Sequence, residues 1–252
     1  MSTPDFTLPP LPARAHRILL FVAMEAEAAP IATRLGLAPA ACEARGATAR
    51  RGTVAGAEIT LVAAGIDPDA RADRIGPIHA AAVLASMLHA GRYDVVANMG
   101  TAGGFVAQGL GIADLVLART TMFHDARVAL AGFDQIARAH TRLSPGDAQL
   151  AALSTRLGAR VGLASSGSSL DATDAELALF ARERTLAKDM ELAALAVVCR
   201  THALPLVALK GVTDLVDHHE AAHEAFLRNL ARTSARVAAA ARPLLEFLVA
   251  PR

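Results

Sequence analysis

Short apolar runs recur along this chain, separated by segments that carry glycine, proline or charged residues. Most of the runs are rich in Val, Leu, Ile and Ala and are too short for stable helices, which is typical of strands buried on both faces of a sheet. The predicted strands are residues 17–23, 47–54, 56–64, 94–98, 114–121, 160–163 and 206–209.

Longer stretches between these strands have the alanine and leucine content of helices. The predicted helices are residues 28–35, 75–89, 175–181, 188–199 and 226–248. Strands that alternate with helices predict an α/β fold, a three-layer αβα sandwich. We assign residues 17–252 to a single domain, and we expect residues 1–16, which contain several prolines, to form a disordered lead.

Composition restricts the partners and the location that we expect. The 252 residues include 25 basic and 24 acidic ones, and this balance favours neither a nucleic acid nor an anionic membrane as a partner. No run has the roughly 18 uninterrupted apolar residues of a membrane span. The N-terminus lacks the apolar segment of a secretory signal, and Cys42 and Cys199 form no disulfide framework, so we expect a cytoplasmic protein with reduced cysteines.

Charged side chains follow two of the predicted strands, at the place where open α/β sheets carry their chemistry. Lys210 and Asp214 follow the last predicted strand, and Glu27 follows the first. Glu191 lies within the apolar helix that precedes the last strand. We predict that Asp214 and Glu191 hold opposite sides of one ligand. A simpler alternative for Glu27 and its neighbour Glu25 is that they complement the positive end of a helix.

A glycine-rich segment, residues 99–105, follows the predicted strand at 94–98. Its glycines allow the backbone to approach a ligand closely, and its N–H groups are available to bind one. The spacing does not match G-x-G-x-x-G, so a nicotinamide-binding Rossmann fold is disfavoured. The alternative without a ligand is a tight turn between a strand and a loop.

Residues 219–223 match the pattern H-E-x-x-H, in which two histidines on one helix face bind zinc and the glutamate acts as a base. Zinc also needs a third ligand, for which Glu246 lies at a plausible distance downstream. A chain of buried strands and small loops does not resemble the helical active site of the zincins. We therefore favour a polar, solvent-facing helix start, and we expect no metal.

Six segments, taken in order along the chain, match one family. They are residues 23–28 (AMEAEA), 98–104 (NMGTAGG), 123–125 (FHD), 165–171 (SSGSSLD), 189–191 (DME) and 210–214 (KGVTD). From about Arg17 to Leu248 the chain resembles the 5′-methylthioadenosine nucleosidases of the nucleoside phosphorylase superfamily, and KDMELAA at 188–194 resembles the plant-type branch. The resemblance implies a mixed central sheet, no cofactor and a homodimer. It also implies hydrolysis of the N-glycosidic bond of 5′-methylthioadenosine, S-adenosylhomocysteine or another 5′-substituted adenosine, with release of adenine.

The resemblance also implies a role for each matching residue. Asp214 would be the general acid that protonates adenine N7, Glu191 would hold the ribose hydroxyls, and Glu27 would orient the attacking water. Ser168 departs from the family, which usually has an aspartate there. The implied substrate contacts are Thr101 and Lys210 around the water, Ala102 and Gly103 of the glycine segment, Met190 beneath the sugar, Ser169, Leu170 and Asp171 along the adenine edge, and Phe133 across a dimer interface.

The proposed chemistry needs these residue types, because adenine leaves readily only when it is protonated. An aspartate supplies that proton at neutral pH when burial raises its pKa. Two other functions remain open. A phosphorylase would need basic side chains near Glu27; residues 24–30 contain none, although Arg71 and Arg74 lie in the loop before the second predicted helix. The other alternative is a non-catalytic nucleoside-binding protein, because fold alone does not fix function.

Overall fold

The computed structural model describes residues 6–137 and 139–251. Its strands are β1 (Phe6–Thr7), β2 (Arg17–Val22), β3 (Ala38–Ala40), β4 (Thr48–Val54), β5 (Ala57–Ala63), β6 (Ile66–Asp67), β7 (Ala72–Asp73), β8 (Val95–Gly104), β9 (Leu115–Phe123), β10 (Thr141–Arg142), β11 (Ala159–Ser166), β12 (Ala187–Asp189) and β13 (Leu206–Leu215). Its helices are α1 (Glu25–Leu35), α2 (Pro77–Ala90), the 3-10 helix η1 (Val106–Gln108), α3 (Phe133–Ala137), α4 (Asp147–Leu157), α5 (Asp174–Glu183), α6 (Leu192–Thr201) and α7 (Ala222–Val249).

The central sheet contains both parallel and antiparallel pairs. β2 lies between β5 and β8 and runs parallel to both, and β8 continues in parallel with β13. β13 runs antiparallel to β9, β9 is parallel to β11, β11 is parallel to β12, and β12 returns antiparallel to β8. The predicted α/β class with a mixed sheet is therefore confirmed. The pairings also close a ring through β8, β13, β9, β11 and β12, which the sequence does not predict.

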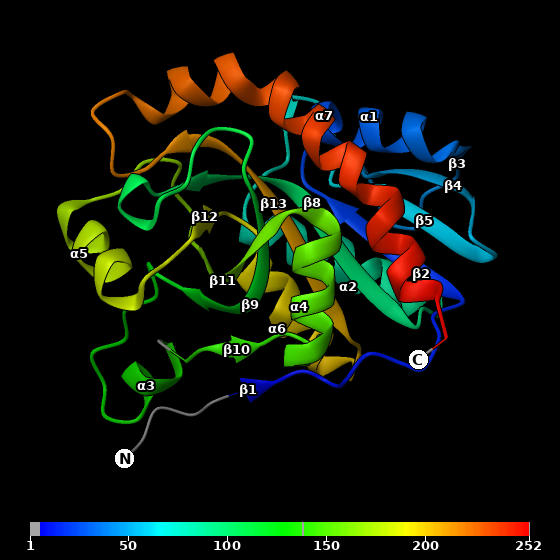
Figure 1. Cartoon of the computed structure of the whole chain (residues 1–252), viewed down its shortest axis with the longest axis horizontal. Coiled ribbons are helices and arrows are strands. Elements are labelled where there is room, and N and C mark those ends of the chain that lie inside the picture. Colours follow the sequence, from blue (N-terminus) through cyan, green and yellow to red (C-terminus); the bar gives the residue numbers. More distant parts are fainter. Residues whose placement is uncertain (1–5, 138, 252) are drawn as a thin grey trace.

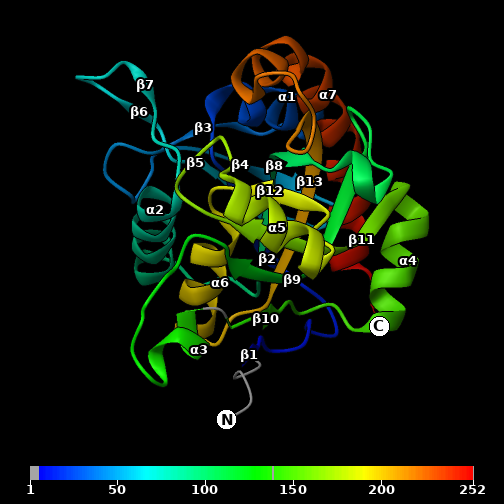
Figure 2. The same ribbon diagram turned by 90° about the vertical axis from the view of Figure 1, so that its left-hand side faces the viewer.

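Hydrophobic side chains alternate between two cores, one on each side of the sheet. On β2, Ile18 and Leu20 face one core, whereas Leu19 and Phe21 face the other. Helices α1, α4 and α7 pack on the first core, and α2 and α6 pack on the second (Figure 1 and Figure 2). The three predicted layers are thus present. In the described ranges, no helix is long and apolar enough to cross a membrane.

Residues 6–16 are not disordered, and that expectation is wrong for them. β1 pairs in parallel with β10, and the apolar side chains of Leu8, Leu11 and Ala15 are buried. The prolines of this segment are compatible with an extended chain, and burial of its leucines holds the segment against the protein. Residues 1–5 lie outside the described residues.

The two strands that carry most of the predicted site are longer than expected. β8 continues through the glycine-rich segment, and β13 continues to Leu215, so Lys210 and Asp214 lie within a strand rather than after it. The cause is continuous pairing between the two strands, in which Gly100 lies opposite Lys210. The register shifts between Val212 and Asp214. Such an irregularity re-aims the side chain that follows it, here the Asp214 carboxylate.

The helix predicted at 188–199 begins later than expected. Residues 187–189 form β12, which pairs with β11, and α6 starts at Leu192. The Leu192 N–H donates to the Asp189 carboxylate at 3.0 Å, which satisfies one of the unpaired N–H groups of the first helical turn. Glu191 therefore lies at the junction between strand and helix, at the N-cap position.

Candidate active site

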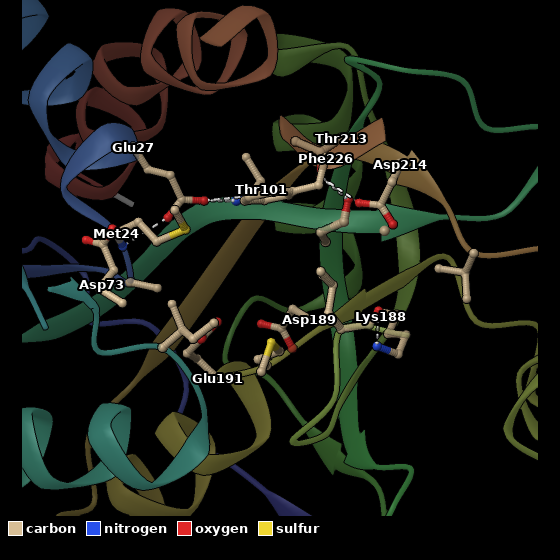
Figure 3. Close-up of a pocket in the computed structure, with 18 residues that line it drawn as sticks. Met24, Glu27, Asp73, Thr101, Lys188, Asp189, Glu191, Thr213, Asp214 and Phe226 are labelled. Atoms are coloured by element: carbon tan, nitrogen blue, oxygen red, sulfur yellow. Dashed lines mark hydrogen bonds between the residues drawn. The ribbon is translucent and has the colours of Figure 1, made fainter. Parts of the chain in front are cut away.

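A cavity of about 320 Å³ opens where β2, β8, β12 and β13 end. Figure 3 shows Glu27 and Glu191 toward one end of this cavity, and Asp214 and Lys188 toward the other. The three carboxylates predicted to act together therefore line one cavity, although they are far apart in the chain. The lining residues are Ala23, Met24, Glu27, Ala72, Asp73, Ile75, Thr101, Ala102, Gly103, Leu170, Lys188, Asp189, Met190, Glu191, Thr213, Asp214, Val216 and Phe226.

Glu27 lies in the first turn of α1 and is held by donors from two elements. Its Oε1 atom accepts hydrogen bonds from the Thr101 N–H at 2.6 Å and from the Thr101 hydroxyl at 2.7 Å. Its Oε2 atom accepts a hydrogen bond from the Met24 N–H at 3.2 Å. A Cβ atom on Gly100 would lie 3.2 Å from the same carboxylate, so glycine leaves room for it. The carboxylate thus interacts with its own helix start and also lines the cavity.

Glu191 is buried at the opposite wall and is tied to the loop before α2. Its Oε1 atom accepts a hydrogen bond from the Gly76 N–H at 2.8 Å. Gly76 has a φ of 96°, which favours glycine, and this conformation aims the N–H at the carboxylate. Burial raises the pKa of Glu191 to about 7, against the opposing positive charge of Lys210. Glu191 is therefore oriented by the backbone before any ligand binds.

Lys210 does not line the cavity but lies behind it in a buried ion pair. Its Nζ atom is 2.7 Å from Asp189 Oδ2, and both side chains are almost fully buried. Burial opposes the charge on Lys210, but attraction from Asp189 and Glu191 outweighs burial and raises its pKa. Ser166 donates a hydrogen bond to the other oxygen of Asp189. The ammonium predicted to contact the attacking water is thus engaged by a carboxylate that sequence analysis did not select.

Asp214 is buried at the other end of the cavity, as a general acid requires. Its Oδ1 atom accepts a hydrogen bond from the Thr213 hydroxyl at 2.8 Å. Burial raises the pKa of Asp214, while this hydrogen bond and the positive charge of Lys188 lower it. Gly103 lies beside the carboxylate, and a Cβ atom there would lie 2.8 Å from Asp214 Oδ2. The glycine at 103 therefore makes space for the acid as well as for a ligand.

The segment predicted to read the adenine edge lies at the Asp214 end, but only part of it reaches the cavity. Leu170 lines the cavity, whereas Ser169 and Asp171 are not among the lining residues. The Lys188 Nζ atom donates to the backbone carbonyls of Ser169 and Leu170. The Ser168 N–H donates to Asp125 Oδ2 at 2.8 Å. The segment is therefore tethered on two sides.

Of the remaining predicted substrate contacts, four line the cavity and one does not. Thr101, Ala102, Gly103 and Met190 line the cavity. Phe133, which the family resemblance places at a dimer interface, is 59% exposed on α3 and is not among the lining residues.

Sequence analysis does not select four polar residues of the lining, namely Asp73, Lys188, Asp189 and Thr213. Lys188, Asp189 and Thr213 belong to the motifs KDMELAA and KGVTD, in which the family resemblance gives roles to other residues. Asp73 lies on β7, in a charged stretch of sequence without a distinguishing pattern. Its Oδ1 atom accepts a hydrogen bond from the Glu25 N–H at 2.9 Å at the start of α1. The two motifs therefore offer a usable signal for Lys188, Asp189 and Thr213, and the charged stretch around Asp73 offers none.

The H-E-x-x-H segment does not have the geometry that zinc binding requires. Helix α7 begins at Ala222, so His219 precedes the helix and does not share a helical face with His223. Glu220 instead pairs with Arg228 in an exposed ion pair. Among residues 6–137 and 139–251, no cluster of three or more His, Cys, Asp or Glu side chains is arranged to hold a metal ion.

Comparison with known proteins agrees with this architecture. The family model described as the phosphorylase superfamily matches residues 17–246. A 5′-methylthioadenosine nucleosidase of Arabidopsis thaliana is 32% identical, covering 92% of this chain and 86% of the relative. A 5′-methylthioadenosine/S-adenosylhomocysteine nucleosidase of the same plant is 31% identical, covering 92% of this chain and 91% of the relative.

A solved structure of an Arabidopsis thaliana 5′-methylthioadenosine nucleosidase in its apo form has a similar fold. It has a TM-score of 0.87 at 29% sequence identity, covering 95% of this chain and 96% of that one. Sequence and structure thus agree over nearly the whole chain. The protein belongs to the phosphorylase superfamily and, within it, to the family of the 5′-methylthioadenosine nucleosidases.

Proposed function

We propose that this protein hydrolyses the N-glycosidic bond of 5′-methylthioadenosine and releases adenine. The observation that carries the proposal is the placement of Glu27, Glu191 and Asp214 around one cavity. Relatives that are 32% and 31% identical over 92% of this chain are named as nucleosidases of this substrate, and the second also carries S-adenosylhomocysteine in its name.

The arrangement suits hydrolysis through a sugar cation. Asp214, whose pKa is raised by burial, is the acid that protonates the leaving adenine. Departure of the base leaves positive charge on the ribose, and the Glu191 carboxylate at the hydroxyl face stabilises that charge within a dry pocket. Glu27 positions the attacking water, which accelerates the reaction by fixing its orientation. A protein that only binds nucleosides would not need all three groups.

The surroundings of Glu27 support water rather than phosphate as the nucleophile. A carboxylate at this position would repel a phosphate dianion. Lys188 is the one basic residue among the described lining residues, and it lies at the Asp214 end of the cavity, away from Glu27. Arg74 packs against the backbone at Gly46, and Arg71 is exposed, and neither lines the cavity. These observations favour the hydrolase over the phosphorylase.

The nature of the nucleophile is tested by the phosphate dependence of the reaction. We expect the purified protein to release adenine from 5′-methylthioadenosine at the same rate in phosphate-free buffer and in added phosphate, with free 5-methylthioribose as the second product. Analysis of the sugar product by mass spectrometry gives the answer directly. A rate that depends on phosphate, together with a sugar 1-phosphate product, would contradict the hydrolase. The same assay with S-adenosylhomocysteine and other 5′-substituted adenosines defines the accepted 5′ group.

We further propose that the active protein is a homodimer with α3 at the interface. The support is a cluster of exposed apolar side chains in and before α3, namely Leu130, Phe133 and Ile136, which a monomer would leave in water. Light scattering after gel filtration should give the mass of two chains. Phe133→Ser combined with Ile136→Ser should give a single-chain mass. A wild-type mass of one chain at assay concentration would refute the dimer.

A further inference from the structure

Lys188 occupies a position in the cavity that the roles of the three carboxylates do not explain. It lies on β12, is 5% exposed and lines the cavity at the same end as Asp214 (Figure 3). It is also one of only two lysines in the chain, the other being Lys210, and all the remaining basic residues are arginines. Both lysines are buried at this site, so the site holds lysine where the rest of the chain uses arginine.

The contacts of Lys188 link two parts of the site. Two of its three N–H donors are directed at the carbonyl oxygens of Ser169 and Leu170, the second at 2.9 Å. These carbonyls belong to the segment at the adenine end of the proposed substrate, and Leu170 lines the cavity. A compact ammonium on a flexible stem can reach two neighbouring carbonyls, whereas the planar fork of arginine is suited to a carboxylate.

The charge of Lys188 also acts on Asp214. Burial lowers the pKa of Lys188, and Asp214 gives the largest opposing effect. In the reverse direction, the Lys188 charge lowers the pKa of Asp214, which burial raises. The groups that interact electrostatically with Lys188 come from several elements: Asp214 on β13, Glu176 on α5, Asp171 in the tethered segment, Asp189 on β12 and His124 after β9.

We propose that Lys188 is a positioning residue that holds the segment 168–171 at the adenine end of the cavity and, through its charge, limits how strongly Asp214 retains its proton. This inference rests on the proposed function, because it deepens the roles of the acid and of the base-binding segment. Because Lys188 both holds the segment and acts on Asp214, its loss should alter substrate affinity and the pH profile together.

Lys188→Met removes both the donors and the charge. We expect KM to rise roughly tenfold or more, because two charge-assisted hydrogen bonds are lost. The rate should also persist to higher pH. An acid must be protonated to act, so kcat/KM falls as pH rises through the pKa of Asp214. Without the Lys188 charge that pKa rises, so the falling limb of the pH profile of kcat/KM should move to higher pH by about one unit. Lys188→Gln should show the same shift of the limb with a smaller rise in KM, since its amide keeps two donors.

Two further variants separate the tether from the charge. Asp125→Ala releases the other tether of the segment, at Ser168. It should raise KM and leave the falling limb of the pH profile in place, because burial, Thr213 and Lys188 shift the pKa of Asp214 and Asp125 is not among these influences. Lys188→Arg keeps the charge and should also leave the limb in place. The proposal is overturned if Lys188→Met and Lys188→Gln leave the limb where it is in the wild type, or if Asp125→Ala moves it as far as they do.

A measurement without turnover keeps the test independent of the proposed function. Amide hydrogen exchange should be faster at residues 168–171 in Lys188→Met than in the wild type, with unchanged exchange in β2 and β5. Equal exchange in the two proteins would overturn the tethering role. A wild-type protein that releases no adenine would instead overturn the proposed function, while the exchange experiment would still report on Lys188.

Discussion

Asp214→Asn should lower the rate of adenine release by about 10²–10⁴-fold while nucleoside binding stays measurable. Asparagine has nearly the same shape as protonated aspartate and can still accept the hydrogen bond from the Thr213 hydroxyl, so the pocket should keep its form. It cannot deliver a proton to the leaving base. The measurement combines a rate assay for adenine with calorimetric titration of the intact nucleoside.

Asp217→Asn is the matched control for this prediction. Asp217 lies three residues further along the chain, outside the lining of the cavity. Its carboxylate accepts hydrogen bonds from the Val106 and Ala107 N–H groups at the start of η1. The control should keep a rate close to that of the wild type. Retention of the wild-type rate in Asp214→Asn would contradict its role as the acid, as would a loss of nucleoside binding that fully accounts for the loss of rate.

Lys210→Met should destabilise the protein by about 3–5 kcal/mol, because it leaves the Asp189 carboxylate buried without its ion-pair partner. The hydrogen bonds from Ser166 and from the Leu192 N–H remain, but neither supplies a positive charge. Equilibrium unfolding in urea gives the free energy. The exposed pair between Arg228 and Glu220 provides the comparison, since Arg228→Met should leave the unfolding free energy nearly unchanged.

A double variant separates the cost of the unpaired charge from that of lost packing. Combining Lys210→Met with Asp189→Asn removes both charges, so its destabilisation should be clearly smaller than the sum of the two single effects. Additive losses would show that Lys210 and Asp189 do not stabilise each other. Lys210 and Asp189 both act electrostatically on Glu191, so these variants also report how far the Glu191 side of the cavity depends on the pair.

The convergence of the three carboxylates was predictable from the sequence because of a general property of sheets. Glu27 and Asp214 each follow or end a buried strand, and the carboxyl ends of neighbouring parallel strands meet at one edge. The sequence predicts Glu191 within a helix, whereas it lies at the junction of β12 and α6, because an apolar run of this length fits a strand followed by a helix as well as one helix. The side-chain roles beyond this geometry stay predictions.

Other features depend on contacts that a single sequence does not reveal. The ring of strands through β8, β13, β9, β11 and β12 arises from pairings between distant segments, and periodicity carries no signal for the order of strands. The ion pair of Lys210 with Asp189 depends on that order, because β12 and β13 both pair with β8. Helix α4 is different, because Leu150, Leu153 and Leu157 recur with helical spacing and this pattern is sufficient to predict the helix.

The most direct measurement is a crystal structure of the Asp214→Asn protein with 5′-methylthioadenosine bound. We expect adenine N7 to lie opposite residue 214, the ribose hydroxyls to contact the Glu191 carboxylate, and a water held by Glu27 to lie beneath the anomeric carbon. A nucleoside bound with its ribose away from Glu191, or an anion in place of that water, would contradict it.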